Sequence, residues 1–196
     1  MSWGLRILGL ILVAVVSGLV WWYIHADSRP AGDAAQPTQN PTAGQFEFTP
    51  AVDPRRDPSC AEHAYNQVKT FFQQTPCQQL TRALYTTLTR DGRKVYTNVS
   101  VVRMPTADDA ARLRALADKD NTGNVNDLIR EGLVKVPPLK SLSNGGGYQA
   151  VQHEQNVIIV ESDYDPAVKK GDKKQDEAAL DTICEDAIRL GDQIGA

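Results

Sequence analysis

Residues 84–104 read LYTTLTRDGRKVYTNVSVVRM and decide the fold. On either side of Arg90-Asp91-Gly92-Arg93 the residues alternate in polarity and are rich in Thr, Val and Tyr, which favour strands. An Asp-Gly pair between two such runs is a strong signal for a tight hairpin turn. The stretch therefore predicts two antiparallel strands, at 84–89 and 95–104.

A second hairpin is predicted further along the chain. Residues 148–154 and 157–163 read as strands on either side of Gln155-Asn156. Val157-Ile158-Ile159-Val160 is the most apolar strand candidate, so we expect it to be central.

Apolar residues at helical spacing predict one helix before the first hairpin, one between the hairpins and one after the second. Their apolar stripes run over Ala61–Phe72, Ala110–Ala117 and Leu180–Ile188. The order helix, hairpin, helix, hairpin, helix predicts an α+β domain over residues 55–196. The economical arrangement is a four-stranded antiparallel sheet with the helices packed on one face, which leaves the other face or the sheet edge free.

The N-terminal segment has a different character. Residues 7–24 are eighteen consecutive residues without a charge, enough for a helix of about 27 Å that crosses a bilayer. Trp21-Trp22-Tyr23 at one end and Arg6 at the other predict an uncleaved transmembrane signal anchor over residues 1–26. The alternative is a cleaved signal peptide, which normally has a shorter apolar region and a small-x-small cleavage site.

Residues 27–54 are rich in Pro, Gly, Ala and Gln and show no apolar period, so they predict a flexible linker. Under the positive-inside rule, the N-terminus stays in the cytoplasm and residues 55–196 lie outside the plasma membrane as an extracytoplasmic domain.

Charge excludes one class of function. The 196 residues carry 21 Lys and Arg against 24 Asp and Glu, a net charge of −3. Nucleic-acid-binding domains normally show a basic footprint, so we expect no nucleic acid as a partner.

Catalytic and cofactor motifs are not found. His63 and His153 lack the helical two-histidine spacing of a zinc hydrolase, and Gly145-Gly146-Gly147 lacks the Lys-Ser/Thr of a phosphate loop. The sequence therefore predicts no catalytic residue, no metal site and no cofactor. An envelope-acting enzyme that uses His63 or His153 stays open as an alternative.

Three cysteines allow one disulfide, which an exported location permits. Cys60 and Cys77 flank the first predicted helix, and a bridge would clamp its ends. A continuous helix would hold them about 25 Å apart, so the pairing requires a short or bent helix. The alternatives are a pairing with Cys184, on the buried stripe of the last helix, and no disulfide at all.

The segments CAEHAYNQVKTFFQQTPC (60–77), LTRALYTTLTRDG (80–92) and VVRMP (101–105) resemble a group of actinobacterial single-pass membrane or exported proteins of unknown function. The resemblance covers about residues 60–160. It implies a membrane or exported location and a pairing of Cys60 with Cys77, and it supplies no catalytic residue, cofactor or substrate.

Together these features predict a membrane-anchored extracytoplasmic domain, more a binding protein than an enzyme. Its partners would be the lipid bilayer, through the N-terminal helix, and a protein or ligand of the cell envelope. A sensor of a small ligand is the alternative binding function, and it predicts an apolar cleft between sheet and helices.

Overall fold

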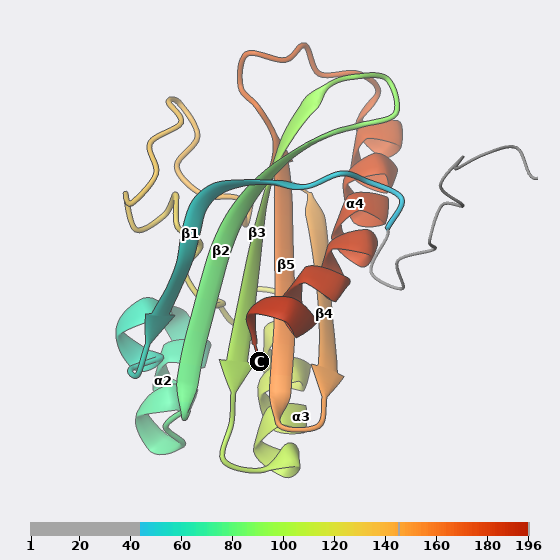
Figure 1. The fold of residues 1–196 in the computed structure, drawn as a ribbon. Helices are drawn as coiled ribbons and strands as arrows, with labels where there is room; N and C mark the ends of the chain where they lie inside the picture. The colour runs from blue at the N-terminus through green and yellow to red at the C-terminus, as the bar shows by residue number, and fades with distance from the viewer. Residues whose placement is uncertain (1–43, 145, 196) are drawn as a thin grey trace, which may run out of the picture. The chain divides into compact units, whose positions relative to one another are not determined.

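A twisted antiparallel sheet of five strands organises the part of the chain that the computed structural model describes, residues 44–144 and 146–195 (Figure 1). The strand order is β1-β2-β3-β5-β4. The strands are β1 (Thr49–Asp57), β2 (Gln79–Leu88), β3 (Lys94–Arg103), β4 (Gly147–His153) and β5 (Asn156–Tyr164).

Both predicted hairpins are present. β2 pairs with β3 around the Asp-Gly turn, and β4 pairs with β5 around Gln155. Gly92 has φ +80°, a conformation that only glycine adopts without strain, and its N–H donates to the carbonyl of Thr89 at 2.9 Å. The Asp-Gly signal therefore marks the turn correctly.

The predicted count of four strands is wrong, because β1 adds a fifth at the edge of the sheet. β1 pairs with β2 from Thr49 opposite Thr86 to Asp57 opposite Leu80, with register shifts on either side of Val52. Most of β1 lies in the segment predicted to be a linker. Pro50 and Pro54 cannot donate to a strand ladder, so this strand is tolerated only at an edge.

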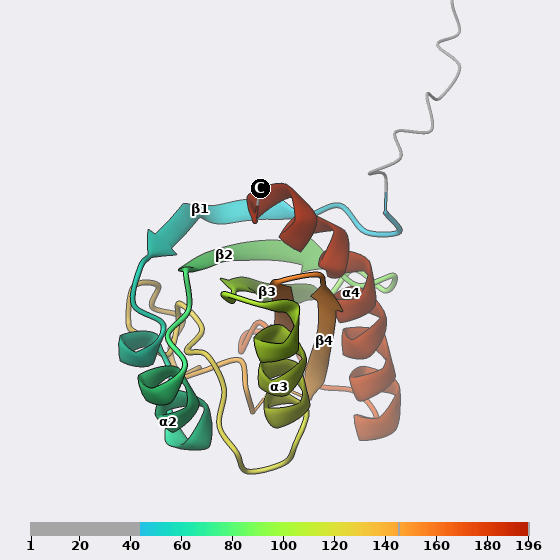
Figure 2. The same ribbon diagram turned by 90° about the horizontal axis from the view of Figure 1, so that it is seen from below.

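The helices cover both faces of the sheet, so their predicted placement on one face is also wrong (Figure 2). Helices α2 (Asn66–Gln74) and α3 (Ala107–Ala117) lie on one face, where Leu113 packs with Val102 and Ile159. Helix α4 (Lys173–Ile194) lies on the other face, where Cys184 packs with Val160.

The apolar side chains of β5, which point alternately to the two faces of the sheet, explain this arrangement. Val157 and Ile159 belong to the core beneath α2 and α3, and Ile158 and Val160 to the core beneath α4. A strand whose residues are apolar at every position must be covered on both sides. Gly191 of α4 lies so close to β5 that an added Cβ would clash with the side chain of Ile158.

The first predicted helix is divided. A short 3₁₀ turn, η1 (Ala61–His63), is followed by two extended residues before α2 begins. Ala64 forms a bridge with Val125, in the irregular segment between α3 and β4. That segment packs Leu128 and Leu142 against Leu84 on the same face of the sheet as α2 and α3.

No helix within residues 44–144 and 146–195 has the length and apolar character needed to cross a bilayer. The predicted anchor at residues 1–26 and most of the predicted linker lie outside the described residues.

Candidate functional site

A polar pocket of about 530 Å³ opens between the sheet, the start of α2 and the loop that follows α3. Its lining brings together residues from four distant parts of the chain: Tyr65, Asn124, Arg130, Ser143, Tyr148 and Glu161. Its size falls within the usual range of small-molecule sites, about 300–1,000 Å³.

Glu161 is the buried acidic residue of this pocket. It follows the apolar run of β5 and shares a sheet face with Val157 and Ile159, and it is only 4% exposed. Tyr148 lies opposite it on β4 and Asn98 opposite it on β3. The strand alternation that buries the core residues therefore also buries this carboxyl group.

Asn124 is the hydrogen-bond partner that the described residues provide for the Glu161 carboxyl group. Its side-chain N–H donates to Oε1 of Glu161 at 3.2 Å, and its own oxygen accepts the backbone N–H of Val125 at 2.8 Å. The second bond fixes which end of the amide faces Glu161, so Asn124 presents a donor to the pocket acid.

Burial raises the pKa of Glu161 to about 8, and the negative charge of Asp127 adds to the rise. The Asn124 hydrogen bond and the Arg130 charge oppose the rise without cancelling it. At neutral pH the carboxyl group is therefore mostly protonated. In that form it donates as well as accepts hydrogen bonds.

Asp127 is equally buried but is fully satisfied. Its carboxylate accepts the backbone N–H groups of Ile129 and Arg130 at 2.9 Å, the hydroxyl of Ser141 at 2.6 Å and the N–H of Leu142 at 3.2 Å. Four donors to one carboxylate account for a structural role in folding the long loop. Glu161 has no comparable set of partners.

Arg130 is held at the mouth of the pocket. Its guanidinium lies 3.8 Å from the ring centroid of Tyr65, and its Nη1 donates to Ser143 Oγ at 3.4 Å. Ser143 contacts Ser141 at 2.7 Å, and Ser141 donates to Asp127. Stacking and a chain of hydroxyl groups therefore orient this exposed cation.

Tyr148 supplies another wall. The ring is half-buried, and its hydroxyl donates to Asp118 Oδ1 at 3.5 Å. Burial raises the pKa of Tyr148 well above its usual value, so the phenol stays protonated at physiological pH and acts as a donor.

The disulfide-closed segment supports one wall of the pocket. The N–H of Tyr65 donates to the carbonyl of Asn124 at 3.1 Å, and the N–H of Gln67 donates to that of Thr122 at 2.8 Å. The N–H of Asn126 donates to the carbonyl of His63 at 2.7 Å. The strand-like contact holds Asn124 in place beside Glu161.

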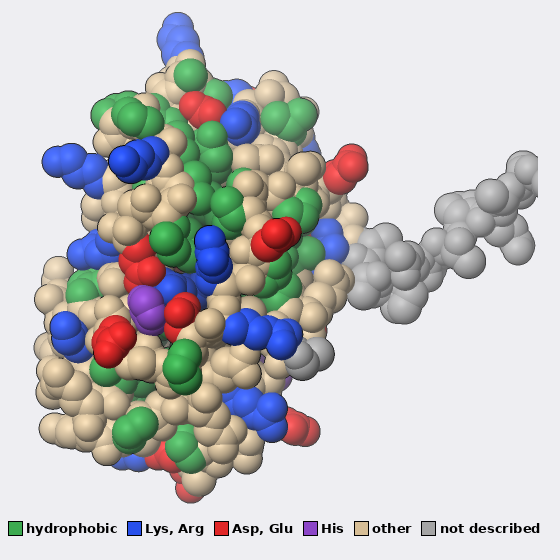
Figure 3. Space-filling model, turned by 60° about the vertical axis from the view of Figure 1, so that its left-hand side comes forward, with side chains coloured by type: hydrophobic (Ala, Val, Ile, Leu, Met, Phe, Trp, Pro, Cys, Tyr) green, Lys and Arg blue, Asp and Glu red, His purple; other side chains and the backbone are tan. Residues whose placement is uncertain are grey.

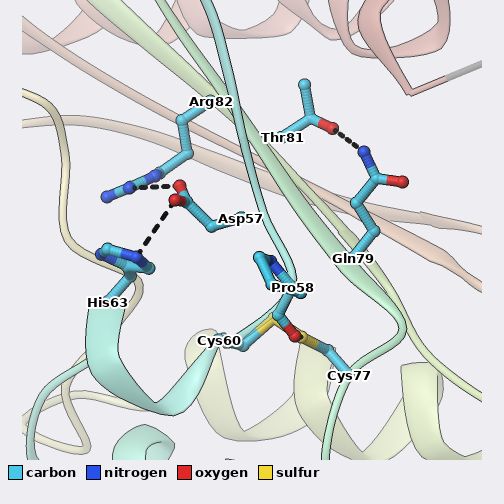
Figure 4. Close-up of a disulfide and its surroundings, with 8 residues drawn as sticks. All are labelled: Asp57, Pro58, Cys60, His63, Cys77, Gln79, Thr81 and Arg82. Carbon is cyan, nitrogen blue, oxygen red and sulfur yellow. Dashed lines mark hydrogen bonds and ion pairs between the residues drawn. A yellow bond between two sulfur atoms is a disulfide. The ribbon is translucent and has the colours of Figure 1, made fainter.

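The structure contains a disulfide between Cys60 and Cys77, the pair that the sequence favours (Figure 4). Their Cα atoms lie 6.0 Å apart. The geometric objection to this pairing disappears because α2 is short and the chain turns back after it.

Cys184, the third cysteine, is a free thiol on α4, which packs on the opposite face of the sheet. Its sulfur lies 3.2 Å from Ser162 Oγ, and burial raises its pKa to about 12. A thiol with a raised pKa is a poor nucleophile, so a catalytic role has no support.

His63 belongs to a charged cluster rather than to the pocket lining. Its Nδ1 lies 2.7 Å from Glu131 and its Nε2 lies 3.4 Å from Asp57. Arg82, 1% exposed, also pairs with both carboxylates, and Figure 4 shows its contact with Asp57. Figure 3 shows acidic, basic and histidine side chains gathered on this face.

Both ring nitrogens of His63 thus face carboxylates, and neither is turned toward the pocket. His153, at the end of β4, is half-exposed and pairs with Asp192 of α4 at 2.8 Å. The two histidines share no contact partner. Within the described residues no group of His, Cys, Asp and Glu side chains has the arrangement of a metal site.

Sequence reasoning missed Glu161, Asn124 and Arg130. One signal was available, because Glu161 follows Val157-Ile158-Ile159-Val160 at a position that alternation assigns to the core. A charged residue at a core position requires a specific partner or a function.

Comparison of this chain with protein-family models, with curated protein sequences and with solved structures finds no match.

Proposed function

We propose that the described domain binds a small polar ligand in the pocket that contains Glu161. The observation that carries this proposal is the Glu161 carboxyl group, which is buried, close to Asp127 and provided with a single hydrogen bond by the described residues. A buried acid with so few partners costs stability, and such groups concentrate at binding and catalytic sites.

The pocket is polar, which differs from the apolar cleft expected of a ligand sensor. Its lining combines aromatic rings, amide groups, a hydroxyl and charged side chains. Groups of this kind select ligands by hydrogen bonding, so the proposed ligand is a polar molecule and not a hydrophobic one.

Binding of a protein partner through an open sheet face has less support. α2, α3 and the long loop cover one face, and α4 covers the other (Figure 2). An enzyme that uses His63 or His153 is also less well supported, since both nitrogens of His63 face carboxylates and neither histidine lines the pocket.

An extracytoplasmic location is part of the proposal. The disulfide between Cys60 and Cys77 supports it, because such bonds persist mainly in oxidising compartments. The apolar segment at residues 7–24 supports it independently. Protease added to intact cells should then digest the domain, and complete protection would contradict the location.

The proposal is tested by a thermal-shift screen of the full-length chain against sugars, amino acids, organic acids and amines. A ligand at about 100 times its Kd stabilises the folded state by about 2.7 kcal/mol, a shift of several degrees in Tm. We expect Asn144→Trp, at the rim of the pocket, to abolish the shift. Gln73→Trp, on the exposed side of α2, should leave it intact.

Two results would contradict the proposal. The first is the absence of any shift across the panel. The second is a shift that persists in the Asn144→Trp variant, because the ligand would then bind elsewhere.

A further inference from the structure

Among the described residues, five side chains with a formal charge line the pocket, and three of them, Asp118, Lys119 and Asp120, are exposed. The other two, Glu161 and Arg130, differ in depth and are opposite in sign when Glu161 is ionised. Glu161 is buried, and Arg130 is exposed at the mouth. The two are close enough for the positive charge of Arg130 to lower the pKa of Glu161. Within the described residues neither side chain forms an ion pair, and each makes one side-chain hydrogen bond.

For Glu161 the missing partner is a cation. Asn124 supplies one hydrogen bond to its carboxyl group, and the described residues form no ion pair with it. The neighbouring Asp127 makes the surroundings of Glu161 more negative. An ammonium group entering the pocket would relieve this repulsion and pair with the carboxylate.

For Arg130 the missing partner is an anion. The described residues place no carboxylate within ion-pair distance of it, although Tyr65 and Ser143 hold the guanidinium in one orientation. A guanidinium with a free edge is well suited to bind a carboxylate through two parallel hydrogen bonds.

Resting on the proposed function, we propose that the ligand is a zwitterion, a small amino-carboxylate whose ammonium group pairs with Glu161 and whose carboxylate pairs with Arg130. The second N–H of the Asn124 amide then supplies a donor along the ligand, and the ring of Tyr148 forms a wall beside it. A molecule with only one of the two charges would leave one of these residues without a partner.

If the proposal is correct, ligand binding releases a proton from Glu161. Burial and the charge of Asp127 raise the pKa of Glu161 and leave it largely protonated at pH 7, although Asn124 and Arg130 act in the opposite direction. The other ionisable side chains that line the pocket in the described part of the chain are Tyr65, Tyr148, Asp118, Lys119 and Asp120. Pairing with an ammonium group requires the carboxylate, so binding at pH 7 releases close to one proton per ligand. The affinity should rise with pH up to about 8 and level off there as long as the ligand keeps its ammonium proton.

Isothermal titration calorimetry of the full-length chain tests the pairing with matched probes. The zwitterions are the ω-amino acids from glycine to 6-aminohexanoate, because their series spans a range of charge separations. Butyrate and butylamine each remove one charged end of 4-aminobutyrate, and glucose is the neutral polar probe. Titration in two buffers of different ionisation enthalpy measures the released proton.

We expect one zwitterion of the series to bind at least about tenfold more tightly than butyrate or butylamine. Arg130→Gln and Glu161→Gln should each lower the affinity for that zwitterion at least about tenfold, since each removes one charged contact. Arg112→Gln is the matched control, because Arg112 is exposed on α3 and pairs with Asp109 outside the pocket. It should leave the affinity unchanged.

Arg130 is exposed, so its variant keeps the test valid if Glu161→Gln fails to fold. Equal affinity for a zwitterion and for butyrate or butylamine would contradict the proposal that the ligand is a zwitterion. Binding of glucose alone, lost in Asn144→Trp, would also overturn it but leave the pocket's ligand-binding function standing. Binding of none of the probes and no hit in the thermal-shift screen would overturn both.

Discussion

Arg82 and Glu161 are ionisable residues on the same face of the sheet, and both are buried. Both Nη groups of Arg82 have partners, the carboxylates of Asp57 and Glu131 and the carbonyl of Asn126 at 3.0 Å, and within the described part of the chain only its Nε has none. Glu161 receives one hydrogen bond from the described residues. Burial of a charge is tolerated when partners surround it, so Arg82 is structural and Glu161 is available to a ligand.

Glu161 should make the stability of the domain fall as pH rises. Above pH 4.5 the unfolded chain loses this proton, whereas the folded chain keeps it up to about pH 8, so the folded state is progressively disfavoured between these values. The loss is on the order of 5 kcal/mol. Glu161→Gln should remove this dependence and raise stability at pH 9.

Urea denaturation of both proteins from pH 5 to pH 9 measures the effect. Glu185→Gln is the control, because Glu185 is exposed on α4. Parallel pH profiles for wild type and Glu161→Gln would show that Glu161 ionises normally.

Replacing Arg82 should destabilise the domain strongly. Arg82→Ala leaves the carboxylates of Asp57 and Glu131 without their buried cation, which should cost about 3–5 kcal/mol. Arg55→Ala, opposite it on the exposed edge strand, should cost less than about 0.5 kcal/mol. Equal urea midpoints for the two variants would contradict the role assigned to Arg82.

At the scale of elements, local sequence signals were sufficient to predict the two hairpins but not to predict which faces of the sheet the helices cover. The Asp91-Gly92 turn and the alternation around it fix the β2–β3 pairing. Val157-Ile158-Ile159-Val160 already indicates a strand covered on both faces, but the one-sided arrangement was predicted. The sequence did not predict β1, because its residues do not alternate in polarity and because Pro50 and Pro54 are unfavourable in most strands.

The pocket could not be predicted in the same way. Tyr65, Arg130 and Glu161 come from separate parts of the chain, and only tertiary contacts bring them together. The split of the first predicted helix at Ala64 and Tyr65 places Tyr65 at the pocket, and a bridge to Val125 stabilises that split. The helical spacing of apolar residues in 57–75 is a local pattern and does not predict a contact with Val125.

The disulfide should stabilise the first helical region through the unfolded state. A bridge across 17 residues contributes about 3 kcal/mol by limiting the unfolded chain. Cys60→Ser and Cys77→Ser should lower Tm equally, and the double variant should be no worse than either. Additive losses would contradict the bridge.

Mass spectrometry of unreduced protein, alkylated after denaturation, checks the same bond. One modified cysteine, Cys184, is the expected result. Three modified cysteines would exclude the disulfide.

At the scale of the molecule, the folded domain extends further toward the N-terminus than the sequence suggested. The N–H groups of Gln45 and Phe46 donate to Asp186 of α4 at 2.9 Å, and the ring of Phe48 meets Tyr85 edge-on at 6.3 Å. Residues 44–57 therefore contribute to the core and the sheet.

A chain that starts at residue 55 should be less stable than one that starts at residue 44. It loses the aromatic contacts of Phe46 and Phe48 and most of β1, which should cost more than about 2 kcal/mol. Thermal unfolding and limited proteolysis of the two chains measure the difference. Identical Tm values would mean that residues 44–54 contribute nothing to the fold.

The central claim is that Glu161 lies protonated in a ligand pocket at neutral pH, and carbon NMR tests it most directly. Carboxyl resonances of the full-length chain, labelled with ¹³C at glutamate, are followed from pH 3 to pH 10, and Glu161 is assigned from the signal missing in Glu161→Gln. We predict a titration midpoint near pH 8. A midpoint near the usual value of 4.5 would contradict the account, because the carboxyl group would then be solvated and not the buried acid on which the proposed site depends.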